Sequence, residues 1–435
     1  MITRRQFVGS LASGLALPGL QAATGWRTVD AAEPRPGGAS PPAGHRKKIA
    51  FLGTSFYRHS HSQHFLDRFA AGYANQGEWV PPALEVAGVY VDQYPANDMG
   101  RQRIAKYGLR TFPTVAETLT LGGSELAVDG VVIIGEHGDY PRNEKGQTLY
   151  PRYRWFKEIV DVFERSKRAV PVFNDKHLST DWGECVEMVA DSRRLGFPFY
   201  AGSSLPVTWR LPALKLPLNT PLVESVCVAY GGVESYDFHT FETTQCMSER
   251  RPGGEVGIRS VHAVRDAKCW ELLANREVTQ KLFLSALRRS HNLPVENGYP
   301  TGPVEFDWAR QALPEIVGYF IEHRDGFRTS TFLTKIRDFN YAGLRGDTGQ
   351  IIGAQFWLPM PGFSATTADF FTPLVELVTR MILTNQTDYP IDRTLLTSGM
   401  VIGGVESLFN GQQPYATPDM AIAYQAQERE PFWNA

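Results

Sequence analysis

The most constraining feature of the sequence is the uninterrupted apolar run Val131–Ile134. It is preceded by Val128-Asp129-Gly130 and followed at once by Gly135-Glu136-His137-Gly138-Asp139. Because the run has no polar alternation, it is typical of a strand buried on both faces, as in a parallel sheet. Ligands of such sheets bind beyond the carboxyl ends of the strands. Glu136 and His137 are therefore candidate site residues, although a solvated turn after a core strand would have the same pattern.

The first half of the chain alternates strand and helix patterns. The other predicted strands are Lys47–Gly53, Leu84–Asp92, Val170–His177 and Phe197–Gly202. Helical patterns lie between them, and Asp181 with Glu184 is typical of a helix start. This order predicts an α/β fold with an N-terminal Rossmann-like, doubly wound parallel sheet.

The second half predicts a different architecture, a C-terminal α+β domain with a mostly antiparallel sheet. Its predicted strands are Val223–Tyr230, Val256–Val264, Phe332–Leu344 and Gln350–Leu358. Apolar-periodic helices are predicted over Phe370–Leu383 and from Arg393 to Asn410.

The N-terminus has the features of a twin-arginine export signal. Arg4-Arg5-Gln6-Phe7 precedes an apolar segment rich in Gly and Ala, and small residues follow at Ala22-Ala23. We therefore expect a signal peptide over residues 1–30, a linker over 31–46, a Rossmann-like domain over 47–210 and the C-terminal domain over 211–435. The expected location is the periplasm or the cell exterior.

Charge and composition exclude some partners. The 435 residues carry a formal net charge of −2, which predicts no nucleic-acid partner. No apolar stretch beyond the signal is long enough to span a bilayer. Buried free thiols are expected for the widely spaced cysteines Cys185, Cys227, Cys246 and Cys269, which form no CxxC motif.

Three histidines follow the first predicted strand within six residues. His59, His61 and His64 could bind a transition metal, because neutral imidazole is a good ligand for zinc, iron or copper. On a helix His61 and His64 would share a face, and His137 could complete the site. Alternatively, these side chains replace a glycine-rich turn and hold a phosphate, a sugar or nothing.

The order of several motifs resembles the glucose–fructose oxidoreductase, inositol dehydrogenase and MocA-like (Gfo/Idh/MocA) family. The motifs are a first strand with a glycine turn, Tyr107-Gly108, the strand beginning Asp129-Gly130-Val131, and Asp175-Lys176-His177. The resemblance extends from about Lys47 to near the C-terminus. It implies a C-terminal sheet that covers the active cleft and forms dimer contacts, and hence a homo-oligomer.

The resemblance also implies roles for individual residues. Lys176 matches the catalytic lysine, His239 the catalytic histidine and Glu242 the second acid of the family's helix, whereas Ser235 replaces the first acid. His239 would be a general acid/base poised near neutral pH. Gly53 and Asp92, together with Glu136 and His137, would bind the cofactor. In the first turn Gly53 is present, but Tyr57, Arg58 and His59 follow it where the family has a GxGxxG turn.

These expectations combine into an enzyme that acts on a small molecule, a sugar or polyol, with NAD or NADP as hydride acceptor. An exported enzyme could not exchange its cofactor with a cytoplasmic pool, so the dinucleotide would be tightly bound. Two alternatives stay open: a metal-dependent lyase or hydrolase that uses the histidine cluster, and a non-catalytic carbohydrate-binding relative.

Overall fold

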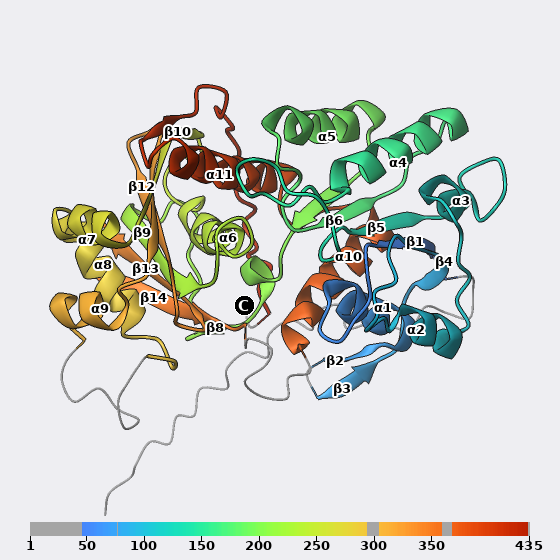
Figure 1. Ribbon diagram of the computed structural model, residues 1–435, viewed down its shortest axis with the longest axis horizontal. Coiled ribbons are helices and arrows are strands. Elements are labelled where there is room, and N and C mark those ends of the chain that lie inside the picture. Colours follow the sequence, from blue (N-terminus) through green and yellow to red (C-terminus); the bar gives the residue numbers. More distant parts are fainter. Residues whose placement is uncertain (1–45, 76, 294–303, 359–367, 434–435) are drawn as a thin grey trace, which may run out of the picture. The chain divides into compact units, whose positions relative to one another are not determined.

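The strands of the first half form a parallel sheet, and helices cover both of its faces (Figure 1). The computed structural model describes residues 46–75, 77–293, 304–358 and 368–433. The twin-arginine segment, the signal and nearly all of the linker lie outside these residues. The parallel strands have the order β4-β1-β5-β6-β7. Their bounds are β1 Lys48–Gly53, β4 Glu85–Val91, β5 Gly130–Ile134, β6 Val172–Asp175 and β7 Phe199–Gly202.

The buried strand predicted at the centre of this sheet is β5. Val132 and Ile134 pack with one hydrophobic cluster, and Val131 and Ile133 pack with another on the opposite face. Each of the four side chains is 0% exposed. Because both faces are covered, a strand of this kind has no room for polar alternation, which confirms the prediction from its sequence.

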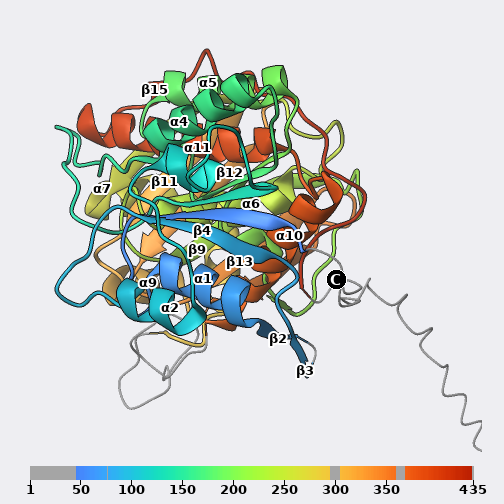
Figure 2. The same ribbon diagram turned by 90° about the vertical axis from the view of Figure 1, so that its right-hand side faces the viewer.

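Helices from both ends of the chain cover this sheet. Figure 2 shows α4 and α5 on one face and α1 on the other. The helices of the first half are α1 His61–Ala71, α2 Gly100–Tyr107, α3 Val115–Thr120, α4 Arg152–Ser166 and α5 Trp182–Leu195. The predicted start of α5 is confirmed, because the Asp181 side chain accepts a hydrogen bond from the Glu184 N–H. A short hairpin, which the sequence analysis did not predict, follows α1 as β2 Tyr73–Asn75 and β3 Glu78–Val80.

The second sheet is mixed but mostly antiparallel, as predicted. Its strand order is β15-β10-β11-β12-β9-β13-β14-β8, and β9 and β12 are its one parallel pair among the described strands. The strands are β8 Arg210–Leu211, β9 Leu222–Tyr230, β10 Ile258–Arg265, β11 Val317–His323, β12 Arg328–Thr334, β13 Phe339–Arg345, β14 Ile351–Phe356 and β15 Tyr415–Ala416. The helices are α6 Asp237–Ser248, α7 Asp266–Ala274, α8 Glu277–Leu287, α9 Phe306–Ala312, α10 Thr372–Thr384 and α11 Ile391–Phe409.

One strand prediction in this half is wrong. The segment Phe332–Leu344 does not form a single strand but contributes to β12 and β13, with a break over residues 335–338. The Thr334 side chain bonds the Ala229 carbonyl and the Ile336 N–H at this break. A threonine hydroxyl can satisfy the backbone locally in this way, so the strand pattern can break without a glycine or proline.

Two C-terminal helices return to the first sheet. Leu374, Val378 and Ile382 of α10 belong to the same core cluster as Ile49 and Phe51 of β1. Leu395 of α11 packs in the cluster on the opposite face. The described residues all lie in one compact unit, and the domain boundary at residue 210 stays a prediction.

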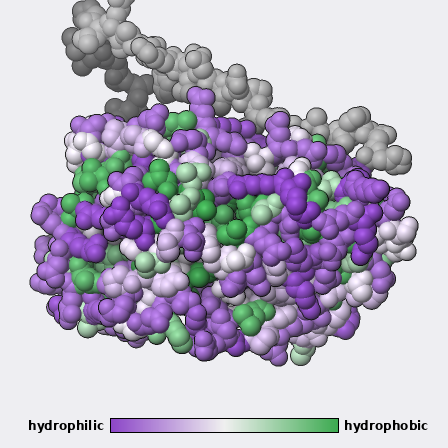
Figure 3. Space-filling view, turned by 90° about the horizontal axis from the view of Figure 1, so that it is seen from above, coloured by the Kyte–Doolittle hydropathy of each residue, from purple (hydrophilic) through white to green (hydrophobic). Residues whose placement is uncertain are grey.

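The surface over α4, α5 and α11 is mostly hydrophilic, with hydrophobic residues in small separate groups (Figure 3). All four cysteines are buried. Among the described residues there is no helix long and apolar enough to cross a membrane.

Candidate functional site

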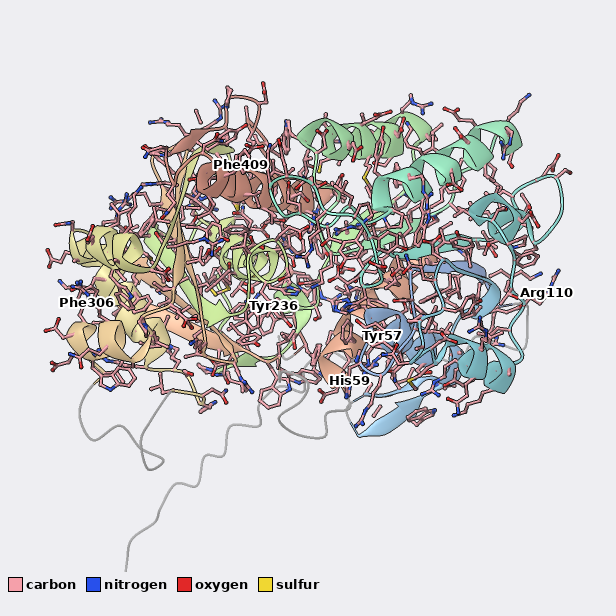
Figure 4. All side chains as sticks on the ribbon, viewed as in Figure 1. Tyr57, His59, Arg110, Tyr236, Phe306 and Phe409 are labelled. Atoms are coloured by element: carbon pink, nitrogen blue, oxygen red, sulfur yellow. The ribbon has the colours of Figure 1, made fainter. Side chains whose placement is uncertain are left out.

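The candidate site lies at the carboxyl ends of the parallel strands, where residues from both halves of the chain meet. Glu136 and His137 follow β5, Lys176 follows β6, and His239 is in the first turn of α6. The strand order reverses at β1, between β4 and β5, and such a reversal opens a crevice in parallel sheets. Tyr57 and Tyr236, labelled in Figure 4, come from the two sides of this region.

Several site residues have a strained backbone. His59, His137, Lys176 and Glu234 have φ values of 69°, 70°, 71° and 69°, in the left-handed region that non-glycine residues seldom adopt. Each such residue costs on the order of 1 kcal/mol, and strain of this kind clusters at functional sites. Seven other non-glycine residues of the described chain also have a positive φ, so these four support the site only together with its contacts.

Lys176 and His239 form the central contact of the site. Lys176 Nζ lies 2.7 Å from His239 Nε2, and both residues are 5% exposed. Glu136 Oε1 lies 3.7 Å from Lys176 Nζ. Burial alone would raise the pKa of Glu136, but Lys176 and the neighbouring imidazoles outweigh it and hold that pKa well below its usual range. The ammonium group of Lys176 is thus held between a carboxylate and an imidazole.

Behind His239 a second set of hydrogen bonds fixes its tautomer. His239 Nδ1 lies 2.9 Å from Ser203 Oγ, and the Ser203 hydroxyl in turn bonds Glu242. When Ser203 donates to the Glu242 carboxylate, its oxygen can accept only from an Nδ1–H group on His239. We therefore assign the proton to Nδ1, which leaves the Nε2 lone pair facing Lys176.

Glu242, which the resemblance matches to the second acid of the family's catalytic helix, lies buried behind His239. Glu242 is 0% exposed and accepts hydrogen bonds from the Ser203 N–H at 3.1 and 3.2 Å. Burial raises the pKa of Glu242 to about 7. Glu242 thus acts on His239 through Ser203, a residue that the sequence analysis did not identify.

His239 itself is not poised near neutral pH, contrary to the expectation. Burial, and next the positive charge of Lys176, lower the pKa of His239 well below its ordinary value. It is therefore neutral at physiological pH. A neutral imidazole whose Nε2 lone pair faces Lys176 can accept a proton from a hydroxyl group that displaces this contact.

The histidine cluster comes together but not as a metal site. His61 and His137 have ring centroids 5.2 Å apart, and those of His59 and His64 are 5.8 Å apart. His61 bonds Asp175 through Nδ1, and His64 is stacked on Phe371. Burial lowers the pKa of His64 to about 3. Over the described ranges, no three His, Cys, Asp or Glu side chains are grouped to hold a metal ion, so the metal prediction is not supported.

Asp92, the acid expected to hold the ribose hydroxyls, is bonded on both oxygens. Tyr90 donates to one oxygen and Tyr140 to the other, each at 2.6 Å. Tyr140 belongs to the segment between β5 and α4, which reaches back to the end of β4. A cleft of about 860 Å³ beside Asp92 is lined mainly by tyrosines, Trp182 and charged groups. Lys176 and His239 are not among its described lining residues.

The first turn does not fit a dinucleotide pyrophosphate in the manner of a glycine-rich turn. Thr54, Ser55 and Phe56 are each 0% exposed, so the backbone after Gly53 offers no free surface. The Ser60 side chain caps α1 by accepting from the Gln63 N–H, and the His59 N–H donates to the Gln63 side chain. The Gln63 N–H, one of the donors that could face a phosphate at this helix N-terminus, is thus already bonded within the chain.

Comparisons with known proteins give similarity in structure but not in sequence. No protein-family model matches the chain, and no curated protein matches it. The crystal structure of GenD2 from gentamicin A biosynthesis, in complex with NAD, has a TM-score of 0.54 at 12% identity, covering 89% of this chain and 99% of that one.

Two inositol dehydrogenases from Lactobacillus casei are similar to the same degree. Myo-inositol dehydrogenase in complex with NAD(H) and myo-inositol has a TM-score of 0.52 at 10% identity, covering 85% of this chain and 96% of that one. The apo scyllo-inositol dehydrogenase has a TM-score of 0.51 at 10% identity, covering 86% and 98%. The chain therefore has the fold of these dehydrogenases, and the resemblance to the Gfo/Idh/MocA family is confirmed at the level of the fold.

Proposed function

We propose that the protein is an oxidoreductase-type enzyme that binds a sugar or polyol at Lys176 and His239 and removes the proton from one of its hydroxyl groups. The contact between Lys176 Nζ and His239 Nε2, buried at the carboxyl edge of the sheet, carries this proposal. The fold shared with dehydrogenases whose structures hold NAD, NAD(H) or myo-inositol supports it.

The proton transfer follows from the geometry. Lys176 Nζ and His239 Nε2 are in direct contact, so this contact opens when a substrate binds. The substrate hydroxyl then accepts a hydrogen bond from Lys176 and donates its proton to His239 Nε2. The charge that develops on His239 is stabilised through Nδ1 by Ser203 and Glu242. Glu136 Oε1 lies 3.7 Å from Lys176 Nζ, and the Lys176 side chain can stabilise the alkoxide as it forms.

Oxidation of the carbon also requires a hydride acceptor. NAD or NADP is the acceptor that the resemblance implies, and the structural neighbours named above are described with NAD or NAD(H). The first turn of this chain does not fit that group, so no step is assigned to it. The chemistry derived from this chain's own residues is substrate positioning and proton removal.

The proposal is tested by separating binding from turnover. Binding of myo-inositol and D-glucose is measured by saturation-transfer NMR, and their conversion is followed with NAD⁺ or NADP⁺ supplied. K176M and H239Q should lower turnover by about 10²-fold or more while weakening binding much less, because both residues act on the transferred proton. K281M, which removes an exposed lysine paired with Glu277, is the matched control.

Each outcome of this test has a distinct meaning. Sugar or polyol binding without any turnover would favour the non-catalytic carbohydrate-binding alternative. Absence of binding would refute the proposal. Release of stoichiometric NAD(P)(H) on denaturation would show that a dinucleotide binds despite the filled first turn.

We further propose that the protein is exported by the twin-arginine pathway, which Arg4-Arg5-Gln6-Phe7 supports. The substitution R4K/R5K should retain the full-length chain in the cytoplasm, because the paired arginines are what the translocation machinery recognises. Fractionation of periplasm and cytoplasm measures this. An unchanged periplasmic share of the variant would contradict the export proposal.

A further inference from the structure

His61 has one ring nitrogen fixed and the other free. Its Nδ1 lies 2.6 Å from Asp175 Oδ2, whereas its Nε2 makes no hydrogen bond to any described residue. The His61 side chain keeps 17% of its surface exposed, while that of Asp175 keeps 1%. The partly exposed imidazole of His61 is thus hydrogen-bonded to the buried carboxylate of Asp175.

Asp175 is placed to orient this imidazole. It is the last residue of β6, directly before Lys176, and its Oδ1 is buried without a hydrogen-bond partner among the described residues. A carboxylate in this position holds the proton on Nδ1, leaves the lone pair on Nε2, and stabilises the imidazolium that forms when Nε2 takes up a proton.

The His61–Asp175 pair belongs to the same site as Lys176 and His239 but comes from another element. The His61 ring lies 5.2 Å from the His137 ring, and Glu136, next to His137, pairs with Lys176. A charge on His61 lowers the pKa of both Glu136 and His239. Whereas His239 is presented by α6, His61 is presented by the first turn of α1.

We propose that His61, oriented by Asp175, is a second proton-exchanging catalytic residue of this site and acts on the sugar or polyol substrate through Nε2. This inference rests on the proposed function, from which it takes the class of substrate, a sugar or polyol. It adds a base that the Lys176–His239 chemistry does not use. With two bases, the site can remove a proton from a hydroxyl group through His239 and from a carbon atom through His61.

For a keto sugar, the proposed role of His61 predicts removal and return of the proton on the carbon beside the carbonyl. This exchange needs no oxidant or reductant. The C–H bond beside the carbonyl breaks, its proton goes to His61 Nε2, and its electron pair passes into the carbonyl to give an enediolate, which the Lys176 ammonium stabilises. Return of a proton from Nε2 to the carbon restores the keto sugar. Because the Nε2 proton exchanges with solvent, the carbon acquires deuterium in D₂O.

The experiment measures this exchange. The protein is incubated in D₂O with D-fructose or 2-keto-myo-inositol, and loss of the ¹H signal at the carbon beside the carbonyl is followed by NMR. The wild type should exceed the spontaneous rate, and H61Q and D175N should each reduce the excess at least tenfold. H262Q removes a partly buried histidine of β10 that bonds the Gln412 carbonyl, and it should leave the exchange unchanged.

Two readouts separate this role from a structural one. In ¹⁵N NMR, His61 should carry its proton on Nδ1 in the wild type and lose that preference in D175N. The pH profile of the exchange should report the charged and titratable groups that face His61, which are Asp175, Glu136, His137, His64 and His239. Thermal unfolding checks that H61Q and D175N remain folded.

The failures are distinguishable. Absence of binding of both sugars would defeat the proposed function. Binding without exchange above the spontaneous rate, or exchange that is unchanged in folded H61Q and D175N, would overturn the inference about His61 alone.

Discussion

At the scale of single residues, the site is built from charged groups whose protonation depends on burial. Lys176 lies beside Glu136, while burial lowers the pKa of His239 well below its ordinary value and raises the pKa of Glu242 to about 7. Burial disfavours the charged forms of Glu136, His239 and Glu242, and of these three only Glu136 has enough positive charge nearby to reverse that effect. Hydrogen bonds join Lys176, His239, Ser203 and Glu242, and an ion pair adds Glu136 to this set.

The buried Glu242 gives a prediction with a definite sign. Its folded-state pKa of about 7 exceeds the usual 4.5, so between these pH values the folded state holds a proton that the unfolded state has lost. The contribution of Glu242 to stability therefore falls as pH rises from about 4.5 to about 7. Relative to E242Q, the wild type should be more stable at pH 5 than at pH 8 by about 2 to 3 kcal/mol.

Urea unfolding of both proteins at the two pH values measures this difference. Groups other than Glu242 titrate alike in both proteins and cancel. E277Q, at an exposed position of α8, is the control and should show no such difference. An E242Q effect that is the same at pH 5 and pH 8 would mean that Glu242 titrates normally.

At the scale of elements, the site depends on where strands end. Gly202 ends β7 with φ +130°, and a Cβ atom there would lie 2.6 Å from Glu242 Oε1. The close approach lets Glu242 of α6 reach the Ser203 N–H and hydroxyl. A glycine at this strand end is therefore required by the hydrogen bonds that hold His239.

The substitution G202A tests this requirement. It should lower the free energy of unfolding by about 3 to 5 kcal/mol, because it combines an unfavourable φ with a clash against a buried carboxylate. G196A, at the end of α5, is the matched control: φ is +69° there and nothing lies within 4 Å of the added Cβ. It should cost only about 1 kcal/mol. Equal effects of the two substitutions would contradict a special role for Gly202.

At the scale of the whole molecule, the parallel sheet is completed by the end of the chain. Ile382 of α10 lies so close to Gly130 of β5 that a Cβ on Gly130 would be 2.8 Å from its Cγ1. α10 and α1 share one face of the sheet, and Leu395 of α11 packs on the other. One face of the parallel sheet, whose strands all precede residue 203, is therefore covered in part by residues beyond 370.

We predict that residues 46–210 expressed alone do not fold cooperatively. The fragment would leave the apolar face under α10 in contact with water, which costs about 25 cal/mol per Å² of exposed apolar surface. Near-UV circular dichroism and thermal unfolding, compared with the full chain, measure this. A sharp two-state transition in the fragment would instead support an autonomous domain with the predicted boundary.

The sequence alone determined the local features of this protein. The apolar run Val131–Ile134 predicted a strand covered on both faces, and the polar residues after it were expected at the carboxyl edge of the sheet. Because the edge of a parallel sheet collects strand ends, Lys176 and His137 could be assigned to one region. His239 could be placed beside them only through the resemblance to a family.

Tertiary structure decided what these residues do. The pairing of His61 with Asp175, and the link from Glu242 through Ser203 to His239, join residues 114 and 36 or more positions apart. No local pattern encodes such contacts, so the histidine cluster suggested a metal site and His239 suggested a neutral-range pKa. Charge states depend on the burial and partners that a fold supplies, and these exist only once distant segments have packed together.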